Sequence, residues 1–538
     1  MSAFISALAY SWISHCAAFL LMPRAMALNY RLRVLVTWAV AALALFTIQD
    51  SMTVMSVVAF AAVLFAPHEA PKRAAFFVSV APCLPVYLAA PLPFPGLNYL
   101  LGASHYKLIA VSLLLPLFFL RRLPDEFAFA SRTDRSKGAV VLDFSVIVYI
   151  VYTAIIVANS FNLTSSLRFA FDQSLTLALP YFALRYAIRT VDDVEIVLEG
   201  FLVAAIMLAL VSLVSTAKQW DFYLLLNPAS MPELRAGFVR IHGPANTHSL
   251  GYHLAAAVVI LAFLRRHLKI GWRPYWTLHI VLIGGMYFAN SQGAVVSLAV
   301  ALVACFVISL KSNFLRTGVL GVLVAGCLLG GAWLLVGRTG AADVYGSIEY
   351  RQRLFEIGSA YILEHPIFGD YNFYSNPVFE PLRQGQGIID ITNLYLQILL
   401  HYGFVGGILF FSIMMVPLVA IVHLSFRLSG LTDSSSRELG QGRIMASSPG
   451  VEPQKFAELS VMKWRRLAAV AFGTQMGWLV LVGTTSDVGL TIHLGIFCAA
   501  LCRVVWNLGT QTAASIADQP RISSRFAGSQ HSIDRSKI

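Results

Sequence analysis

The sequence predicts an all-α fold, a polytopic membrane bundle of about 12 to 15 transmembrane helices with one large, partly helical loop outside the membrane. Two observations predict it. Hydrophobic residues make up 58% of the 538 residues and charged residues only 12%, and a soluble domain of this size cannot bury so much apolar surface. The apolar residues also fall into separate segments, with clusters of Lys and Arg between them.

The apolar segments are candidate membrane spans, since a helix that crosses a bilayer needs about 20 largely apolar residues. Several segments are shorter, so we expect some helices to be tilted, re-entrant or fused with a neighbour. In order, the segments are 3–22, 34–48, 52–65, 74–90, 108–120, 144–158, 175–184, 197–214, 250–264, 276–288, 294–310, 319–336, 404–424, 467–482 and 490–505.

Positive charge orients these spans. One alternating assignment places 30 of the 39 Lys and Arg on one side, and the positive-inside rule identifies that side as the cytoplasm. The N-terminus then lies outside and the C-terminus inside. The net charge of +12 is explained by the cytoplasmic loops, so no nucleic-acid partner is expected.

The same assignment divides the chain. We expect transmembrane helices in residues 1–336 with a first outer loop at about 217–247, a large outer loop at 337–391, C-terminal transmembrane helices in 392–506 with a flexible inner loop at about 428–462, and a flexible inner tail at 507–538. Loops longer than about 15 residues are usually functional or disordered. Apolar and aromatic residues recur through the large outer loop, which indicates that it is folded.

Cysteine predicts neither a disulfide scaffold nor a metal site. All six cysteines lie within apolar segments, none at metal-ligand spacing from a histidine, so we interpret them as small buried residues. The sequence also has no Walker loop, dinucleotide fingerprint or serine nucleophile elbow. We therefore expect an enzyme that uses neither a metal nor a cofactor.

Arginines in the outer loops run against the positive-inside bias, which suggests that they have a function there. A guanidinium group stays charged and binds phosphate through two parallel hydrogen bonds. We therefore expect a lipid-linked pyrophosphate to bind Arg235, Arg240, Arg351 and Arg353. The alternative is ordinary salt bridging with Glu233, Glu349 and Glu356.

Acid–base candidates lie in the large outer loop. Transfer of a glycosyl group needs a base for the acceptor hydroxyl and a cation for the departing phosphate. Asp390 is the favoured base because it immediately precedes the apolar stretch 391–400, and Glu356 and His365 are the other candidates. The alternative role for Asp390 is to cap the helix that follows it.

Both outer loops resemble those of the O-antigen ligase and O-antigen polymerase family of bacterial inner membranes. The resemblance covers roughly residues 235–407, with a hydropathy match over the rest. Its motifs are Arg240-Ile-His-Gly243-Pro244-Ala-Asn246, Arg240 with Gly251, Ser291-Gln-Gly293, Arg353 followed by His365-Pro366-Ile-Phe-Gly369, and Thr392-Asn393 followed nine residues later by Gly403-Phe-Val-Gly406.

The resemblance implies a multi-pass protein of the bacterial inner membrane whose outer loops are periplasmic. It implies an inverting glycosyltransferase whose donor is a polyprenyl-pyrophosphate-linked glycan, acting among membrane lipids. Asn246, Thr392 and Asn393 would then contact substrate beside the four arginines. Other assembly proteins, such as a flippase or a chain-length regulator, could act with it.

One departure from the family pattern decides between activities. Ligases of the family carry a histidine, thought to activate the acceptor, where this chain has Thr392. Threonine cannot take up a proton at neutral pH, so we favour a polymerase of surface or exo-polysaccharide over a ligase that transfers glycan to lipid A core or to protein. A secondary transporter or flippase is the other alternative. A transporter would need charged or polar residues deep within its spans. The predicted spans are nearly free of them, and the main exception, Glu199, lies near the inner end of its span.

Overall fold

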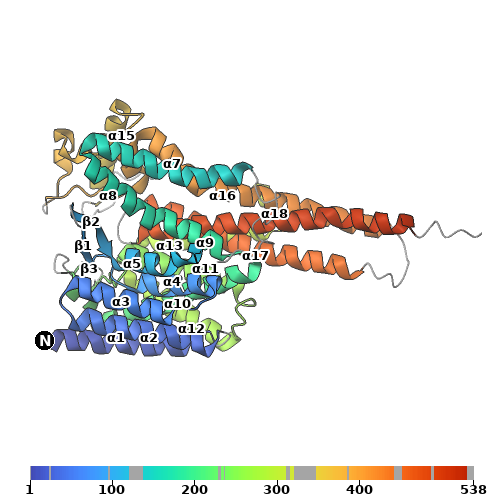
Figure 1. Cartoon of the computed structure of the whole chain (residues 1–538), viewed down its shortest axis with the longest axis horizontal. Helices are drawn as coiled ribbons and strands as arrows, with labels where there is room; N and C mark the ends of the chain where they lie inside the picture. Colours follow the sequence, from blue (N-terminus) through green and yellow to red (C-terminus); the bar gives the residue numbers. More distant parts are fainter. Residues whose placement is uncertain are drawn as a thin grey trace, which may run out of the picture.

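The computed structural model confirms the predicted fold class, because long helices run side by side through most of the molecule (Figure 1). The residues that it describes are 2–23, 26–94, 97–119, 137–227, 232–235, 237–310, 315–319, 347–384, 387–441, 451–485 and 490–529. Within these ranges, eight helices are long and apolar enough to cross a membrane, and Ser51–Phe65 and His105–Phe119 are shorter apolar helical segments. The span expected at 319–336 lies almost wholly outside the described residues.

The N-terminal body contains most of the helices. They are α1 (Ser2–Leu21), α2 (Leu28–Thr47), α3 (Ser51–Phe65), α4 (Ala70–Val80), α5 (His105–Leu114), α6 (Pro116–Phe119), α9 (Leu179–Ala187), α10 (Val191–Ala217), α11 (Thr247–Leu264), α12 (Trp272–Ala289) and α13 (Gln292–Ser309). Helix α10 is buried along most of its length and packs against α1, α4, α11 and α12.

A second group of helices lies along one side of this body (Figure 1). It comprises α7 (Lys137–Ser160), α8 (Leu163–Gln173), α15 (Ser347–Glu364) and α16 (Leu394–Gln441). Helices α17 (Val451–Val482) and α18 (Thr491–Ser529) connect the two groups, since α17 packs on α13 and both pack on α16.

Helices α13 and α17 approach each other closely because α17 carries glycine at two positions one turn apart. A Cβ on Gly473 would lie 2.6 Å from the Ala301 carbonyl oxygen, and one on Gly477 would lie 2.8 Å from that of Ser297. Small residues at this spacing let helix backbones meet within a membrane. The contact fixes α17, whose C-terminal end borders the candidate site described below.

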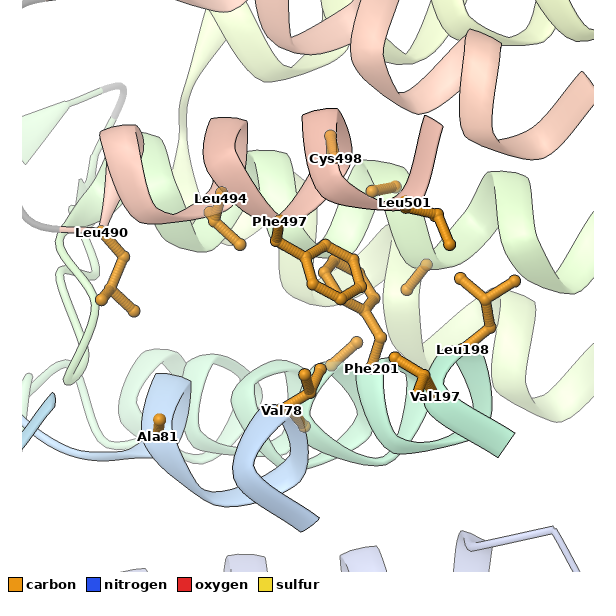
Figure 2. Packing of buried hydrophobic residues seen from close by; sticks show 14 of the residues in the cluster. Val78, Ala81, Val197, Leu198, Phe201, Leu490, Leu494, Phe497, Cys498 and Leu501 are labelled. Atoms are coloured by element: carbon orange, nitrogen blue, oxygen red, sulfur yellow. The ribbon is translucent and has the colours of Figure 1, made fainter. Parts of the chain in front are cut away.

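Aromatic stacking fills the core between α4, α10 and α18 (Figure 2). Phe201 of α10 stacks on Phe497 of α18 with ring centroids 5.2 Å apart, and on His253 of α11 at 3.8 Å. The His253 ring nitrogen Nε2 also lies 3.2 Å from the Phe201 carbonyl oxygen. The sequence expectation that Glu199 is the main polar residue within the spans therefore missed this buried histidine.

Two short β-hairpins were not expected. Strands β1 (Ala89–Phe94) and β2 (Leu97–Ser104) pair antiparallel, as do β3 (Leu234–Arg235) and β4 (Phe238–Val239). The span expected at 74–90 is helical only to Val80, apart from a 3-10 turn at Ala81–Cys83. Pro82 and Pro85 explain the early end, because proline cannot continue an α-helix.

The inner loop expected at about 428–462 is helical wherever it is described. Helix α16 runs on to Gln441 and α17 begins at Val451. In the same way α18 continues to Ser529, into the segment expected as a tail. Residues 442–450 and 530–538 lie outside the described residues. These extensions lie at the end of the molecule opposite α15 (Figure 1).

Helix α16 is interrupted at Gly403, whose φ of 60° and ψ of −166° are not helical. The turn His365–Gly369 fits against this interruption. The Phe404 N–H donates to the Pro366 carbonyl at 2.7 Å, the Asp370 N–H donates to that of Leu400 at 2.7 Å, and the Val405 N–H donates to that of Ile367 at 3.3 Å. We call this contact the glycine junction.

Both glycines of the junction are required by the approach of two backbones. A Cβ on Gly369 would lie 2.5 Å from the Gly403 nitrogen and 2.6 Å from the Leu400 oxygen. Both glycines also have positive φ, which L-residues rarely adopt. Two of the motifs recognised in the sequence, His-Pro-x-x-Gly and Gly-x-x-Gly, are therefore the two sides of one contact.

We predict that Gly369→Ala lowers the thermal unfolding temperature of the purified protein in detergent and displaces α15. Gly387→Ala is the matched control, because Gly387 also has a positive φ of 76° but has no atom within 4 Å of a Cβ. The control should cost only the backbone strain, about 1 to 2 kcal/mol. Equal unfolding temperatures for the two variants would show that the junction is not a steric constraint.

Candidate functional site

Arg240, in the first outer loop, is nearly buried, with 7% of its surface exposed. Its Nη1 donates to Glu233 Oε2 at 2.7 Å, and its Nη2 lies 3.4 Å from His248 Nε2. The other ring nitrogen of His248, Nδ1, lies 3.2 Å from Ser291 Oγ. We call Arg240, His248 and Ser291 the arginine cluster. It joins the loop to the starts of α11 and α13.

Asp221 holds the backbone of this loop in place. Its Oδ2 accepts the N–H groups of His242 at 2.6 Å and Gly243 at 3.0 Å, and its Oδ1 accepts that of Tyr223 at 3.2 Å. Burial raises the pKa of Asp221, while these N–H groups oppose that rise. Burial likewise lowers the pKa of His242, against the pull of the neighbouring Asp221 charge. No motif in the sequence pointed to Asp221.

Asn246, expected to contact substrate, caps α11. Its Oδ1 accepts the His248 N–H at 3.2 Å, which satisfies one of the free N–H groups at the start of a helix. Its φ of 71° with ψ of 150° lies outside the left-handed helical region, in a conformation that residues other than glycine rarely adopt. The Asn246 cap thus positions His248 of the arginine cluster.

Asp390 is held by Tyr350, the first aromatic residue of α15. The Tyr350 hydroxyl donates to the Asp390 carbonyl at 2.8 Å and accepts the Asp390 N–H at 3.0 Å. Burial, together with nearby negative charge that includes Asp390, raises the pKa of Tyr374 to about 12. The half-buried Asp390 therefore lies among two tyrosines at the base of the large outer loop.

Asn393, not Asp390, caps α16. Its Oδ1 accepts the N–H groups of Tyr395 at 2.9 Å and Leu396 at 3.2 Å. The capping role considered for Asp390 is thus taken by another residue. Thr392 lies half-buried between the two, and its N–H donates to the Asp390 carbonyl at 3.1 Å.

The remaining candidates of the large loop lie on exposed parts of α15 and its end. Arg353 forms an i,i+4 salt bridge with Glu349 at 2.5 Å, with 58% of its side chain exposed. Glu356 accepts a hydrogen bond from Gln352 at 3.0 Å. Arg351 and His365 are exposed as well, and the His365 ring stacks on Tyr361. Arg235 lies in β3, and its side chain is outside what the structure describes.

The starts of α13 and α16 both contact the C-terminal end of α17. The Leu394 N–H donates to the Thr485 carbonyl at 3.0 Å. On the other side, a Cβ on Gly293 would lie 2.7 Å from Thr484 Oγ1. The structure therefore brings Arg240, Asn246, Thr392, Asn393 and Asp390 around this end of the bundle.

The arrangement has the chemical groups needed to transfer a substituent away from an anionic leaving group. It offers a guanidinium group in a nearly buried site, an adjacent histidine, and a carboxylate with hydroxyl groups nearby. No group of three or more potential metal ligands occurs within the described ranges. Sequence reasoning missed Asp221, Tyr350 and Thr485. Each forms hydrogen bonds with backbone groups of another segment, and such bonds leave no sequence motif.

We predict that Asp221→Ala destabilises the first outer loop, because it leaves buried N–H groups without an acceptor, at about 1 to 3 kcal/mol for each. Asp221→Asn keeps one acceptor oxygen in the same place and should lose less. Thermal unfolding of purified variants measures the difference. If the alanine variant is as stable as the wild type, Asp221 does not hold this loop.

Comparison with known families gives one match. Residues 277–411 match the sequence model of the family described as O-antigen ligase. The matched segment runs from α12 through the large outer loop into α16, so it contains Ser291, both sides of the glycine junction and Thr392. No curated protein matches the chain at a significant level.

Proposed function

We propose that the chain is a polysaccharide polymerase related to the O-antigen ligase family, a proposal supported by the match over residues 277–411. The long apolar helices fit a multi-pass membrane enzyme that transfers glycans, as the matched family suggests. In our proposal it joins polyprenyl-pyrophosphate-linked repeat units on the periplasmic side of the bacterial inner membrane. The N-terminus would be periplasmic and the C-terminus cytoplasmic.

The observation that carries the proposal is the place of Arg240. Its guanidinium is nearly buried and its Nη1 contacts the Glu233 carboxylate, which is half-exposed. A pyrophosphate oxygen offers the same charge and geometry as that carboxylate oxygen. We propose that the donor pyrophosphate displaces Glu233, and that Arg240 then stabilises the negative charge that develops as the leaving group departs.

In the proposed reaction a hydroxyl oxygen of the acceptor unit attacks the anomeric carbon of the donor. The bond from that carbon to the pyrophosphate oxygen breaks, and the polyprenyl pyrophosphate leaves with the bonding electrons. The hydroxyl proton passes to the Asp390 carboxylate. Tyr350 is a positioning residue, since it holds the Asp390 backbone at both its N–H and its carbonyl group.

Thr392 supports a polymerase over a ligase, because the position at which ligases of the family carry a histidine cannot take up a proton here. A transporter is less well supported. The buried His253 within α11 is stacked on the Phe201 ring and lies 3.2 Å from the Phe201 carbonyl oxygen, which is a structural role. The test is to supply the purified protein, reconstituted in vesicles, with lipid-linked repeat units and to measure the products. A polymerase makes longer chains, a ligase needs lipid A core, and a flippase moves substrate without new glycosidic bonds.

We predict that Arg240→Lys lowers chain extension at least tenfold, because lysine keeps the charge but loses the two-point geometry. Arg353→Lys is the matched control, since Arg353 is exposed and forms a salt bridge with Glu349 one turn away. Both variants are assayed at equal amounts of folded protein. Wild-type rates in Arg240→Lys would contradict the role of Arg240 in binding pyrophosphate.

We predict that Asp390→Asn lowers the rate by about 100-fold to 10,000-fold, the usual loss when a well-placed general base is removed. Thr392→Ala should keep most activity. The loss of a helix cap cannot account for a lower rate in Asp390→Asn, because Asn393 caps α16. Glu356→Gln serves as the control for loss of a loop carboxylate. A fully active Asp390→Asn protein would move the search for the base to Glu356 or His365.

A further inference from the structure

A second cluster of arginines lines a cavity at the end of the bundle opposite the arginine cluster. Helix α11 begins beside His248 and ends at Leu264, while α17 runs toward Thr485, so their other ends lie far from the candidate site. A cavity of about 500 Å³ lies there, between the C-terminal end of α11 and residues 462–466 in the first half of α17. Its polar lining comprises Arg265, Arg266, Tyr275, Ser309, Arg465 and Arg466.

Within the described ranges, three of the four arginines of this cavity have no acid partner. Among the residues that the structure describes, no carboxylate lies within 4 Å of Arg265, Arg266 or Arg466. The nearby acid Glu195 instead contacts His267 at 2.9 Å and Lys463 at 3.5 Å. Several guanidinium groups around one cavity match the chemistry of a phosphate-bearing anion.

Some of these arginines are already held in place. Arg265 lies over the rings of Trp272 and Tyr275, at 4.9 Å and 4.8 Å from their centroids. Arg466 Nη1 lies 3.3 Å from His267 Nε2. Binding an anion would therefore cost less side-chain entropy than ordering free arginines.

The surroundings of the cavity indicate the depth of a lipid headgroup. Trp272 and Trp276, at the start of α12, are 59% and 48% exposed, and tryptophan is enriched where membrane meets water. Phe263 and Met462 line the same cavity, and Met462 is 45% exposed. Apolar side chains beside a basic cavity give acyl chains a surface next to the site for their headgroup.

We propose that this cavity binds the phosphate of an anionic phospholipid in the leaflet away from α15. Basic pockets between transmembrane helices on this face are known to suit such headgroups. The site is separate from the proposed transfer site and does not depend on the reaction. A lipid bound there would hold together the end of α11, the start of α12 and the first half of α17. The other ends of all three helices lie at or beside the arginine cluster.

The test titrates purified full-length protein with phosphatidylglycerol and with phosphatidylcholine of the same acyl chains, read by native mass spectrometry. The wild type should prefer phosphatidylglycerol. Arg266→Gln should weaken the binding of phosphatidylglycerol about fivefold, since each arginine near an anionic lipid contributes about 1 kcal/mol. The double variant Arg266→Gln/Arg466→Gln should weaken it about 25-fold. Arg266 is exposed, so its single variant should fold normally.

Arg273→Gln is the matched control, because it removes the same charge at the same end of the bundle but from outside the cavity. It should bind phosphatidylglycerol as the wild type does. Unchanged binding by the double variant, or equal binding of the two lipids, would overturn the proposal. Complete displacement of the lipid by millimolar inorganic phosphate would assign the cavity to a free anion and overturn the lipid site.

Discussion

The glycine junction is the contact on which the arrangement of the outer face depends. Two backbones meet there, at Gly369 and Gly403, with hydrogen bonds across them and no space for a Cβ on Gly369. The junction ties the end of α15 to the first part of the transmembrane helix α16. Tyr350, at the other end of α15, then reaches Asp390. A steric constraint between two glycines thus places the proposed base.

The second half of the candidate site is held by polar contacts rather than by close packing. Asp221 fixes the loop that carries Arg240, and Asn246 caps the helix that carries His248. The two halves meet through the end of α17, which is itself fixed by its glycine contacts with α13. Movement of α17 along α13 would therefore change the geometry between Arg240 and Asp390.

The sequence predicted the membrane fold because hydropathy and charge are properties of single segments. It also identified Arg240 and both glycine motifs. It could not show that 366–369 and 403–405 touch, since hydrogen bonds between backbones leave no side-chain pattern. The span expected at 74–90 was extended past the true helix end at Val80 because the residues that follow are equally apolar, and Pro82 and Pro85 mark the difference. Arg351, Arg353 and Glu356 were grouped with Arg240 by charge, yet they lie on the exposed face of α15.

The central claim is that the first outer loop and the start of α16 form one binding site for a pyrophosphate-linked lipid. Cysteine protection tests it most directly, in a background in which the exposed Cys16 is replaced by serine. Glu233→Cys, Thr392→Cys and, as a control, Glu349→Cys are labelled with a water-soluble maleimide, with and without polyprenyl pyrophosphate. The claim predicts that the lipid slows labelling at positions 233 and 392 but not at 349. Protection at only one of the two, or at neither, would contradict it.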